Sequence, residues 1–186
     1  MSSPTDVEAI FKEAETSMKK AVDYFKNEIA GFRTGRASSK LVEDIKVDYY
    51  GSKMPLKQIA SITIPEHNQI VIQPWDQNAV SEIEKAIREY LNLNPTVQGN
   101  IIRVVLPPLT EERRKELVRL LHKLAEEARV AIRNVRREAK DKIEDLEGVG
   151  EDEIRRLLDR LQKLTDKYIE AVNQLCEAKE KEILSL

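Results

Sequence analysis

The chain has almost none of the residues from which disulfide frameworks and metal sites are built. Its 186 residues include a single cysteine, Cys176, so no disulfide can form within the chain, which fits a reducing compartment. The two histidines, His67 and His122, lie in different segments and lack the spacing of a metal site. No glycine-rich phosphate loop is present, because Gly148-Val-Gly150 has no strand before it and no lysine after it. We therefore expect no catalytic residues, no metal and no cofactor.

Long apolar runs and aromatic residues are also scarce. No apolar run approaches the about 18 residues that a membrane-spanning helix needs. Acidic residues in the first segment, Asp6, Glu8, Glu13 and Glu15, are not those of a signal peptide. Aromatic residues make up only 5% of the chain and charged residues 34%, which is typical of a helix-rich protein. We expect a cytoplasmic protein, or one of an organelle matrix if a presequence has been removed, with no membrane partner.

Three segments carry an apolar pattern with the helical period. The spacing predicts helices over about residues 4–30, 110–147 and from 151 onward. Ser3 before Pro4, and Thr110 before Glu111, are expected N-caps. Two of the helices have about 35 residues each, or about 50 Å, and the short turn between them makes them antiparallel neighbours. The sequence therefore predicts a long three-helix bundle built from both ends of the chain, 1–30 and 108–186.

The middle of the chain, residues 31–107, differs in kind. Strands are expected at about 45–50, 59–64, 70–72 and 101–106, with a short helix at about 79–90 and prolines Pro65 and Pro74 closing two strands. This pattern predicts a small α/β domain inserted between the first two long helices, so the fold class is α+β. Two connectors, at about 31–36 and 105–109, are expected to act as a hinge; their residues are Arg33, Thr34, Gly35, Arg36, Leu106, Pro107 and Pro108.

Basic residues recur along the second long helix, although the whole chain has a net charge of −2. Between Arg103 and Lys142 there are 12 Lys and Arg against 7 Asp and Glu. Five of the basic residues fall within one sector roughly 100° wide at about 100° per residue; we call them the basic stripe: Arg129, Arg133, Arg136, Arg137 and Lys140. The same sector extends back to His122, Arg119 and Lys115, interrupted by Glu126, and the apolar residues are expected on the opposite face.

A row of guanidinium groups on a rigid helix suits a line of phosphates. Like charges four residues apart destabilise a helix slightly, so a polyanionic partner explains the basic stripe better than a merely solvated surface. Two alternatives remain at this level: a coiled-coil hairpin that binds an acidic protein surface, and an enzyme. The absence of catalytic patterns makes the enzyme the weaker of the two.

Several strings of residues resemble one family, the ribosome recycling factors of bacteria and organelles. They include Arg33-Thr-Gly-Arg-Ala37, Val47-Asp-Tyr-Tyr-Gly51, Leu106-Pro-Pro-Leu-Thr-Glu-Glu-Arg-Arg-Lys115 and Arg129-Val-Ala-Ile-Arg-Asn-Val-Arg-Arg137. The most specific parts are Pro-Pro-Leu-Thr-Glu-Glu-Arg-Arg in the third string and Arg-Asn-Val-Arg-Arg in the fourth. The resemblance covers essentially the whole chain. It implies a hinged molecule with dimensions like those of a transfer RNA, consisting of a three-helix bundle and a small α/β domain.

The resemblance also implies a function. Members bind the post-termination ribosome through large-subunit rRNA and, with elongation factor G and GTP, separate the subunits while hydrolysing nothing themselves. It implies that Arg133, Arg136 and Arg137 contact rRNA, with Arg136 most closely tied to activity. Further basic positions that match the family are Arg33, Arg36, Arg113, Arg114 and Arg129. The expected rRNA-binding set is thus Arg113, Arg114 and the basic stripe, and the protein is expected to be a monomer.

Overall fold

The computed structural model describes residues 4–185, which group by their contacts into two compact units. The first contains the residues up to Ala30 together with Lys115–Lys181, and the second contains Gly31–Arg114 together with the end of the chain from Glu182. The sequence patterns place the domain boundaries at residues 30/31 and 107/108, and these boundaries stay a prediction. The two units are described separately below.

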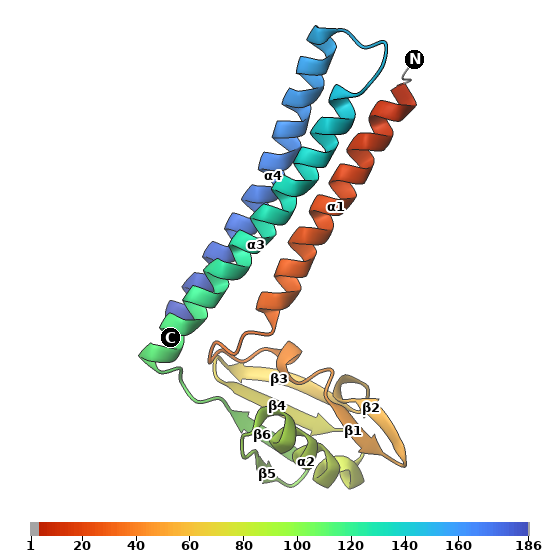
Figure 1. The fold of residues 1–186 in the computed structure, drawn as a ribbon. Helices are drawn as coiled ribbons and strands as arrows, with labels where there is room; N and C mark the ends of the chain where they lie inside the picture. The colour runs from red at the N-terminus through yellow and green to blue at the C-terminus, as the bar shows by residue number, and fades with distance from the viewer. Residues whose placement is uncertain (1–3, 186) are drawn as a thin grey trace. The chain divides into compact units, whose positions relative to one another are not determined.

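Three long helices form the first unit (Figure 1). They are α1 (Pro4–Ala30), α3 (Glu111–Glu144) and α4 (Glu151–Leu184), close to the expected segments. Thr110 is an N-cap as expected, because its Oγ1 accepts a hydrogen bond from the Arg113 N–H at 3.1 Å. The other expected cap, Ser3, lies outside the described residues. Figure 1 shows that α3 runs antiparallel to both α1 and α4.

Apolar side chains from all three helices are buried in the bundle. The most completely buried include Met18, Phe25, Leu121, Ile132, Ile143, Leu161 and Val172. Polar contacts surround this core: the Arg160 guanidinium of α4 binds both Glu8 carboxylate oxygens of α1, at 2.8 and 3.1 Å, and its Cζ lies 3.9 Å from the centroid of the Phe11 ring. Lys142 of α3 reaches Glu13 of α1 at 3.1 Å. These contacts link α1 to α3 and α4 at the surface of the bundle.

The second unit is a small α/β domain. A two-stranded sheet pairs β1 (Lys46–Tyr49) with β2 (Ser52–Pro55), and a four-stranded antiparallel sheet has the order β3-β4-β6-β5. Its strands are β3 (Ala60–Glu66), β4 (Gln69–Pro74), β5 (Thr96–Gln98) and β6 (Ile101–Val105). The helix α2 (Val80–Leu91) contacts β1 and β6. Short 3₁₀ helices occur at Ser39–Leu41, Leu56–Gln58 and Gln77–Ala79.

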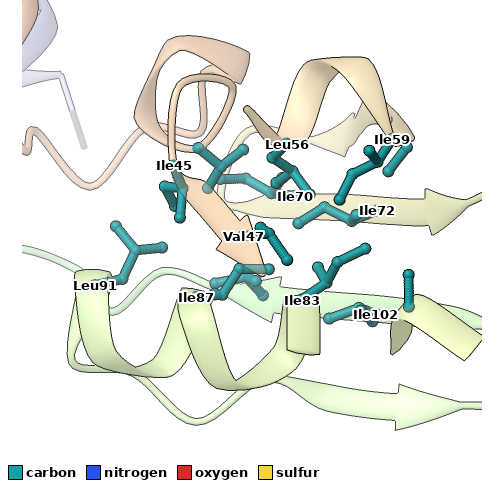
Figure 2. Packing of buried hydrophobic residues seen from close by; sticks show 14 of the residues in the cluster. Ile45, Val47, Leu56, Ile59, Ile70, Ile72, Ile83, Ile87, Leu91 and Ile102 are labelled. Atoms are coloured by element: carbon teal, nitrogen blue, oxygen red, sulfur yellow. The ribbon is translucent and has the colours of Figure 1, made fainter. Parts of the chain in front are cut away.

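An aliphatic cluster joins these elements into a single core (Figure 2). Ile83, Ile87 and Leu91 of α2 recur every four residues and present one buried face. Figure 2 shows them beside side chains from the strands, among them Val47, Ile70, Ile72 and Ile102. The alternation of buried and exposed residues along β4 and β6 follows from the two-residue period of a strand.

The expected fold class, a helical bundle with an inserted small α/β domain, is confirmed. Two short strands, β2 and β5, lie outside the expected set, because they have only four and three residues, too few for an alternating pattern to be recognised, and β5 is exposed throughout. The expectation that Pro65 closes a strand is wrong. β3 continues to Glu66, and the pairing with β4 shifts register between Thr63 and Glu66, which is where a proline can be tolerated in an edge strand.

Candidate nucleic-acid interface

The basic stripe lies on the side of α3 that borders α4, and the expectation that it faces directly away from the apolar side is wrong. Arg129 donates from Nε to Asn173 Oδ1 of α4 at 2.8 Å, and its side chain is only 22% exposed. Seven residues earlier, His122 Nε2 lies 3.4 Å from Glu180 Oε2 of the same helix. The helical angle from the centre of the buried face to the centre of the stripe is roughly 100°, so one edge of the stripe meets the helix–helix contact.

Three of the five stripe residues have carboxylate partners. Glu126 binds both Arg129 and Arg133, with one oxygen to each Nη1, at 3.1 and 3.2 Å. Lys140 lies 3.9 Å from Glu144, at the outer limit of an ion pair. The stripe is therefore less free of internal partners than the sequence suggested.

Arg136 and Arg137 differ from their neighbours. Neither makes a hydrogen bond or an ion pair within residues 4–185, and Arg137 is exposed while Arg136 is half-buried. Arg119 lies at the same helical angle as Arg137, is exposed and also lacks a partner among the described residues. Unpaired guanidinium groups keep all their donors available for a ligand, so these are the three arginines of this face whose donors no other described side chain occupies.

Arg113 and Arg114 do not share this face. At about 100° per residue they fall outside the sector of the basic stripe, on two other sides of α3. Nε of Arg114 is buried with no hydrogen-bond partner in the described part of the chain. The family resemblance grouped them with the stripe as rRNA-binding residues, whereas the helical angle places them on other sides of α3; Arg119, in the extended sector, lies on the side of the stripe.

The expected hinge connectors both lie in the second unit and pack on one another. Gly35 has a φ of +80°, which residues with a side chain rarely adopt. A Cβ added to Gly35 would lie 3.6 Å from both the Pro107 carbonyl oxygen and the Leu109 nitrogen of the second connector. Glycine is thus required there by backbone conformation rather than by a lack of space.

Hydrogen bonds anchor the two connectors at their outer ends. Ala37 N–H donates to the His67 carbonyl at 2.6 Å and Leu106 N–H donates to the Asn68 carbonyl at 2.8 Å, so one turn between β3 and β4 holds both. Arg33 donates to the carbonyls of Tyr90 and Leu91, at 3.2 and 3.3 Å. The stretch between Arg33 and Ala37 has no regular secondary structure. Within it Thr34 is buried, and its Oγ1 donates to Glu182 Oε1 at 3.1 Å.

Groups that could carry catalysis are few in the described residues. Residues 4–185 contain no cluster of His, Cys, Asp and Glu that could hold a metal ion. Cys176 is buried, and burial raises the pKa of its thiol, which keeps it protonated and unreactive. Among the helices described here, none is both long and apolar enough to cross a membrane.

Electrostatically, the stripe is a surface on which cations outnumber anions. From Arg129 to Lys142 there are six Lys and Arg and two Asp and Glu. Guanidinium groups one helical turn apart, such as those of Arg133 and Arg137, can bind successive phosphates of one strand without contacting base edges. This arrangement favours binding to a nucleic-acid backbone over base-specific recognition.

Comparison with known proteins gives a consistent match. The family model described as ribosome recycling factor matches residues 25–184. The chain is 74% identical over 181 residues to a ribosome-recycling factor of Aquifex aeolicus, covering 97% of this chain and 98% of the other. It is 64% identical to that of a Hydrogenobaculum species over 180 residues, covering 97% and 99%.

Solved structures agree with the sequence comparison. A solution structure of ribosome recycling factor superposes with a TM-score of 0.81 at 72% identity, covering all of both chains. A second match describes models of the T. thermophilus ribosome recycling factor and the E. coli elongation factor G bound to the E. coli post-termination complex, with a TM-score of 0.67, 47% identity and coverage of 96% and 98%.

Proposed function

The chain belongs to the ribosome recycling factor family, and we propose that it is the translation factor that, with elongation factor G and GTP, splits the post-termination ribosome into its subunits. The observation that carries this proposal is 74% identity over 97% of the chain to a relative of that name. The match in which a recycling factor and elongation factor G are bound to the post-termination complex supports the two partners. The resemblance noted in the sequence strings is confirmed by the family match.

Phosphates of large-subunit rRNA are bound by Arg136 and Arg137, together with Arg133 and Lys140. The support is that the first two have no competing partner in residues 4–185 and lie on a rigid helix of 34 residues. Because such contacts release counterions, affinity falls steeply as salt is raised. Arg129 contributes to the same field, and its Nε donates to Asn173, which holds the guanidinium in place and leaves its Nη groups available to an anion.

The two connectors act as the hinge through which elongation factor G moves one domain against the other. The positive φ of Gly35 and the irregular backbone between Arg33 and Ala37 support this role. The protein itself is not an enzyme: it supplies binding and stiffness, while GTP hydrolysis belongs to elongation factor G. We place it in the cytoplasm, as a monomer.

A polysome-breakdown assay tests the proposed function. Polysomes stripped of peptide by puromycin are incubated with elongation factor G and GTP, with and without this protein, and separated on a sucrose gradient. The expected result is conversion of polysomes to monosomes and subunits only when the protein, elongation factor G and GTP are all present. Breakdown that is equally fast without the protein contradicts the proposal.

A further inference from the structure

Glu126 interrupts the basic stripe, and its carboxylate bridges two of the arginines. Oε2 lies 3.1 Å from Nη1 of Arg129 and Oε1 lies 3.2 Å from Nη1 of Arg133. A carboxylate held between two guanidinium groups is the arrangement in which those groups would also hold two oxygens of a phosphate. The contact therefore marks a position on α3 that is already suited to an anion.

The two arginines of this bridge are held to different degrees. Arg129 is 22% exposed and also donates to Asn173 of α4, so its guanidinium stays in place whether or not Glu126 is there. Arg133 is 46% exposed and Glu126 is its only partner in residues 4–185. On one side of the site, the guanidinium of Arg129 is held in place. On the other side, the guanidinium of Arg133 is free to move once Glu126 leaves.

The charge on Glu126 is secured by its partners. Hydrogen bonds from Arg129 and Arg133 lower the pKa of the carboxyl group, so it is ionised at neutral pH. Its side chain is 56% exposed, which lets the carboxylate rotate into water once another anion takes its place. An exposed ion pair of this kind is weak, so exchange for a phosphate is energetically accessible.

We propose that Glu126 occupies a phosphate subsite between Arg129 and Arg133 in the free protein and is displaced by an rRNA phosphate on binding. The inference rests on the proposed function, since it assigns a subsite and an internal competitor to the same surface. Each binding event breaks the Glu126–Arg133 contact and each release restores it. Glu126 therefore weakens the grip and shortens the bound lifetime, which suits a factor that must leave the ribosome in every round.

The competing structural role predicts the opposite sign. If Glu126 served to orient Arg133 toward RNA, its removal would weaken binding. Glu127 is a matched control, because it is the same residue type on the next position of α3, is exposed and has no partner among the described residues. Both Glu126→Gln and Glu127→Gln change the net charge by the same amount and keep a good helix former.

The experiment measures binding of full-length wild type, Glu126→Gln, Glu127→Gln and Arg133→Gln, and the double variant Glu126→Gln/Arg133→Gln, to purified bacterial large ribosomal subunits. Affinity and dissociation rate are recorded at two salt concentrations. Glu126→Gln is expected to bind about fivefold tighter than Glu127→Gln, a factor within the range of exposed ion pairs, and to dissociate more slowly. In the Arg133→Gln background most of this gain in affinity disappears, because removing Glu126 then releases a glutamine at position 133 and not an arginine.

Each other outcome overturns the inference. Equal affinities for Glu126→Gln and Glu127→Gln leave only a general charge effect, and weaker binding by Glu126→Gln assigns it an orienting role. In both of these cases the wild type still binds with a steep salt dependence, so the proposed function stands. A wild type that shows no salt-dependent binding removes the proposed function and the inference together.

Discussion

The bundle and the small α/β domain differ in how their charged surface residues are arranged. In the domain, from Gly31 to Thr110, nine Lys and Arg are balanced by eight Asp and Glu. Several of them form local pairs, such as Lys53 with Asp48 at 2.9 Å and Lys57 with Asp44 at 3.1 Å. Other cations of the domain, among them Lys46, Lys85 and Arg103, also lack a partner in residues 4–185, but they lie on different elements, β1, α2 and β6. On α3, by contrast, the unpaired Arg136 and Arg137 lie in one sector of a single helix.

This difference separates charge that maintains solubility from charge that is available to a ligand. Exposed pairs within the domain neutralise each other and contribute little to stability. Arginines and lysines four residues apart on a helix repel one another slightly, and a polyanionic ligand offsets this repulsion. We therefore assign phosphate binding to the bundle, and expect the domain to be recognised by shape and by apolar or neutral groups.

The largest effect is expected from a cavity in one of the two cores. Ile83→Ala removes a fully buried side chain of the α/β domain, and Leu121→Ala does the same in the bundle. Each should cost about 2–5 kcal/mol of the free energy of unfolding of its own unit. Hydrogen exchange should show lost protection in β4, β6 and α2 for Ile83→Ala, and in the middle of the long helices for Leu121→Ala. Equal loss across both units in either variant would mean that they unfold as one.

Removal of a single unpaired arginine comes next. Arg136→Gln should weaken binding to large subunits about 10- to 100-fold, because a hydrogen bond between charged groups is worth about 1.5–3 kcal/mol. Arg156→Gln is the matched control, since Arg156 is exposed on α4 and its weak partner, Glu153, is 3.5 Å away. Circular dichroism should show the same melting temperature for both variants and wild type. An unchanged affinity in Arg136→Gln would remove this face from the interface.

A backbone change in the connector should affect recycling more than binding. Gly35→Ala places a side chain at φ +80° with ordinary contacts around it, and Gly99→Ala does so at φ +61° in open space. Each costs about 1–2 kcal/mol through the left-handed conformation. Only Gly35→Ala should slow polysome breakdown while ribosome binding stays near wild type; Gly35→Pro should do so more strongly. If recycling and binding fall together, Gly35 has no hinge role.

The smallest effect concerns the polar contacts between helices. Arg160 lowers the pKa of the Glu8 carboxyl below its usual 4.5. A carboxyl group whose pKa is depressed by folding stabilises the protein above its unfolded pKa, and that contribution is lost as the pH falls through the folded value. Between pH 5 and pH 3 the melting temperature of wild type should therefore fall slightly more than that of Glu8→Gln. Parallel pH profiles would show that the pair adds no stability.

Most of the fold follows from periodicity in the sequence. The three long helices have continuous apolar faces and identifiable ends, so α1 begins and ends at the expected residues. The strands β2 and β5 could not be found in this way, because they have only four and three residues and are fixed by pairing with β1 and β6. Because proline usually ends a strand, Pro65 predicted the end of β3 too early. Here Pro65 lies at an irregular place in an edge strand of the sheet, where the register shifts.

The candidate site was only partly predictable. Spacing placed the five stripe residues on one side of α3, but it could not show that Arg129 bonds to Asn173, a residue 44 positions away. Nor could it separate Arg133, which shares Glu126, from Arg137, which has no partner in the described chain. The first difference depends on the side chains that α4 presents to α3, and the second depends on the conformation in which Glu126 of α3 itself contacts both Arg129 and Arg133. Helical spacing alone specifies neither.

The salt dependence of large-subunit binding is the most direct test of the claim that the arginines of α3 bind rRNA phosphates. For wild type and the double variant Arg136→Gln/Arg137→Gln, the logarithm of the binding constant is plotted against the logarithm of the salt concentration. Each lost phosphate contact should flatten the slope by about 0.7–0.9, so the slope of the double variant should be shallower by about 1.4–1.8. Equal slopes for the two proteins would show that these arginines do not contact rRNA phosphates.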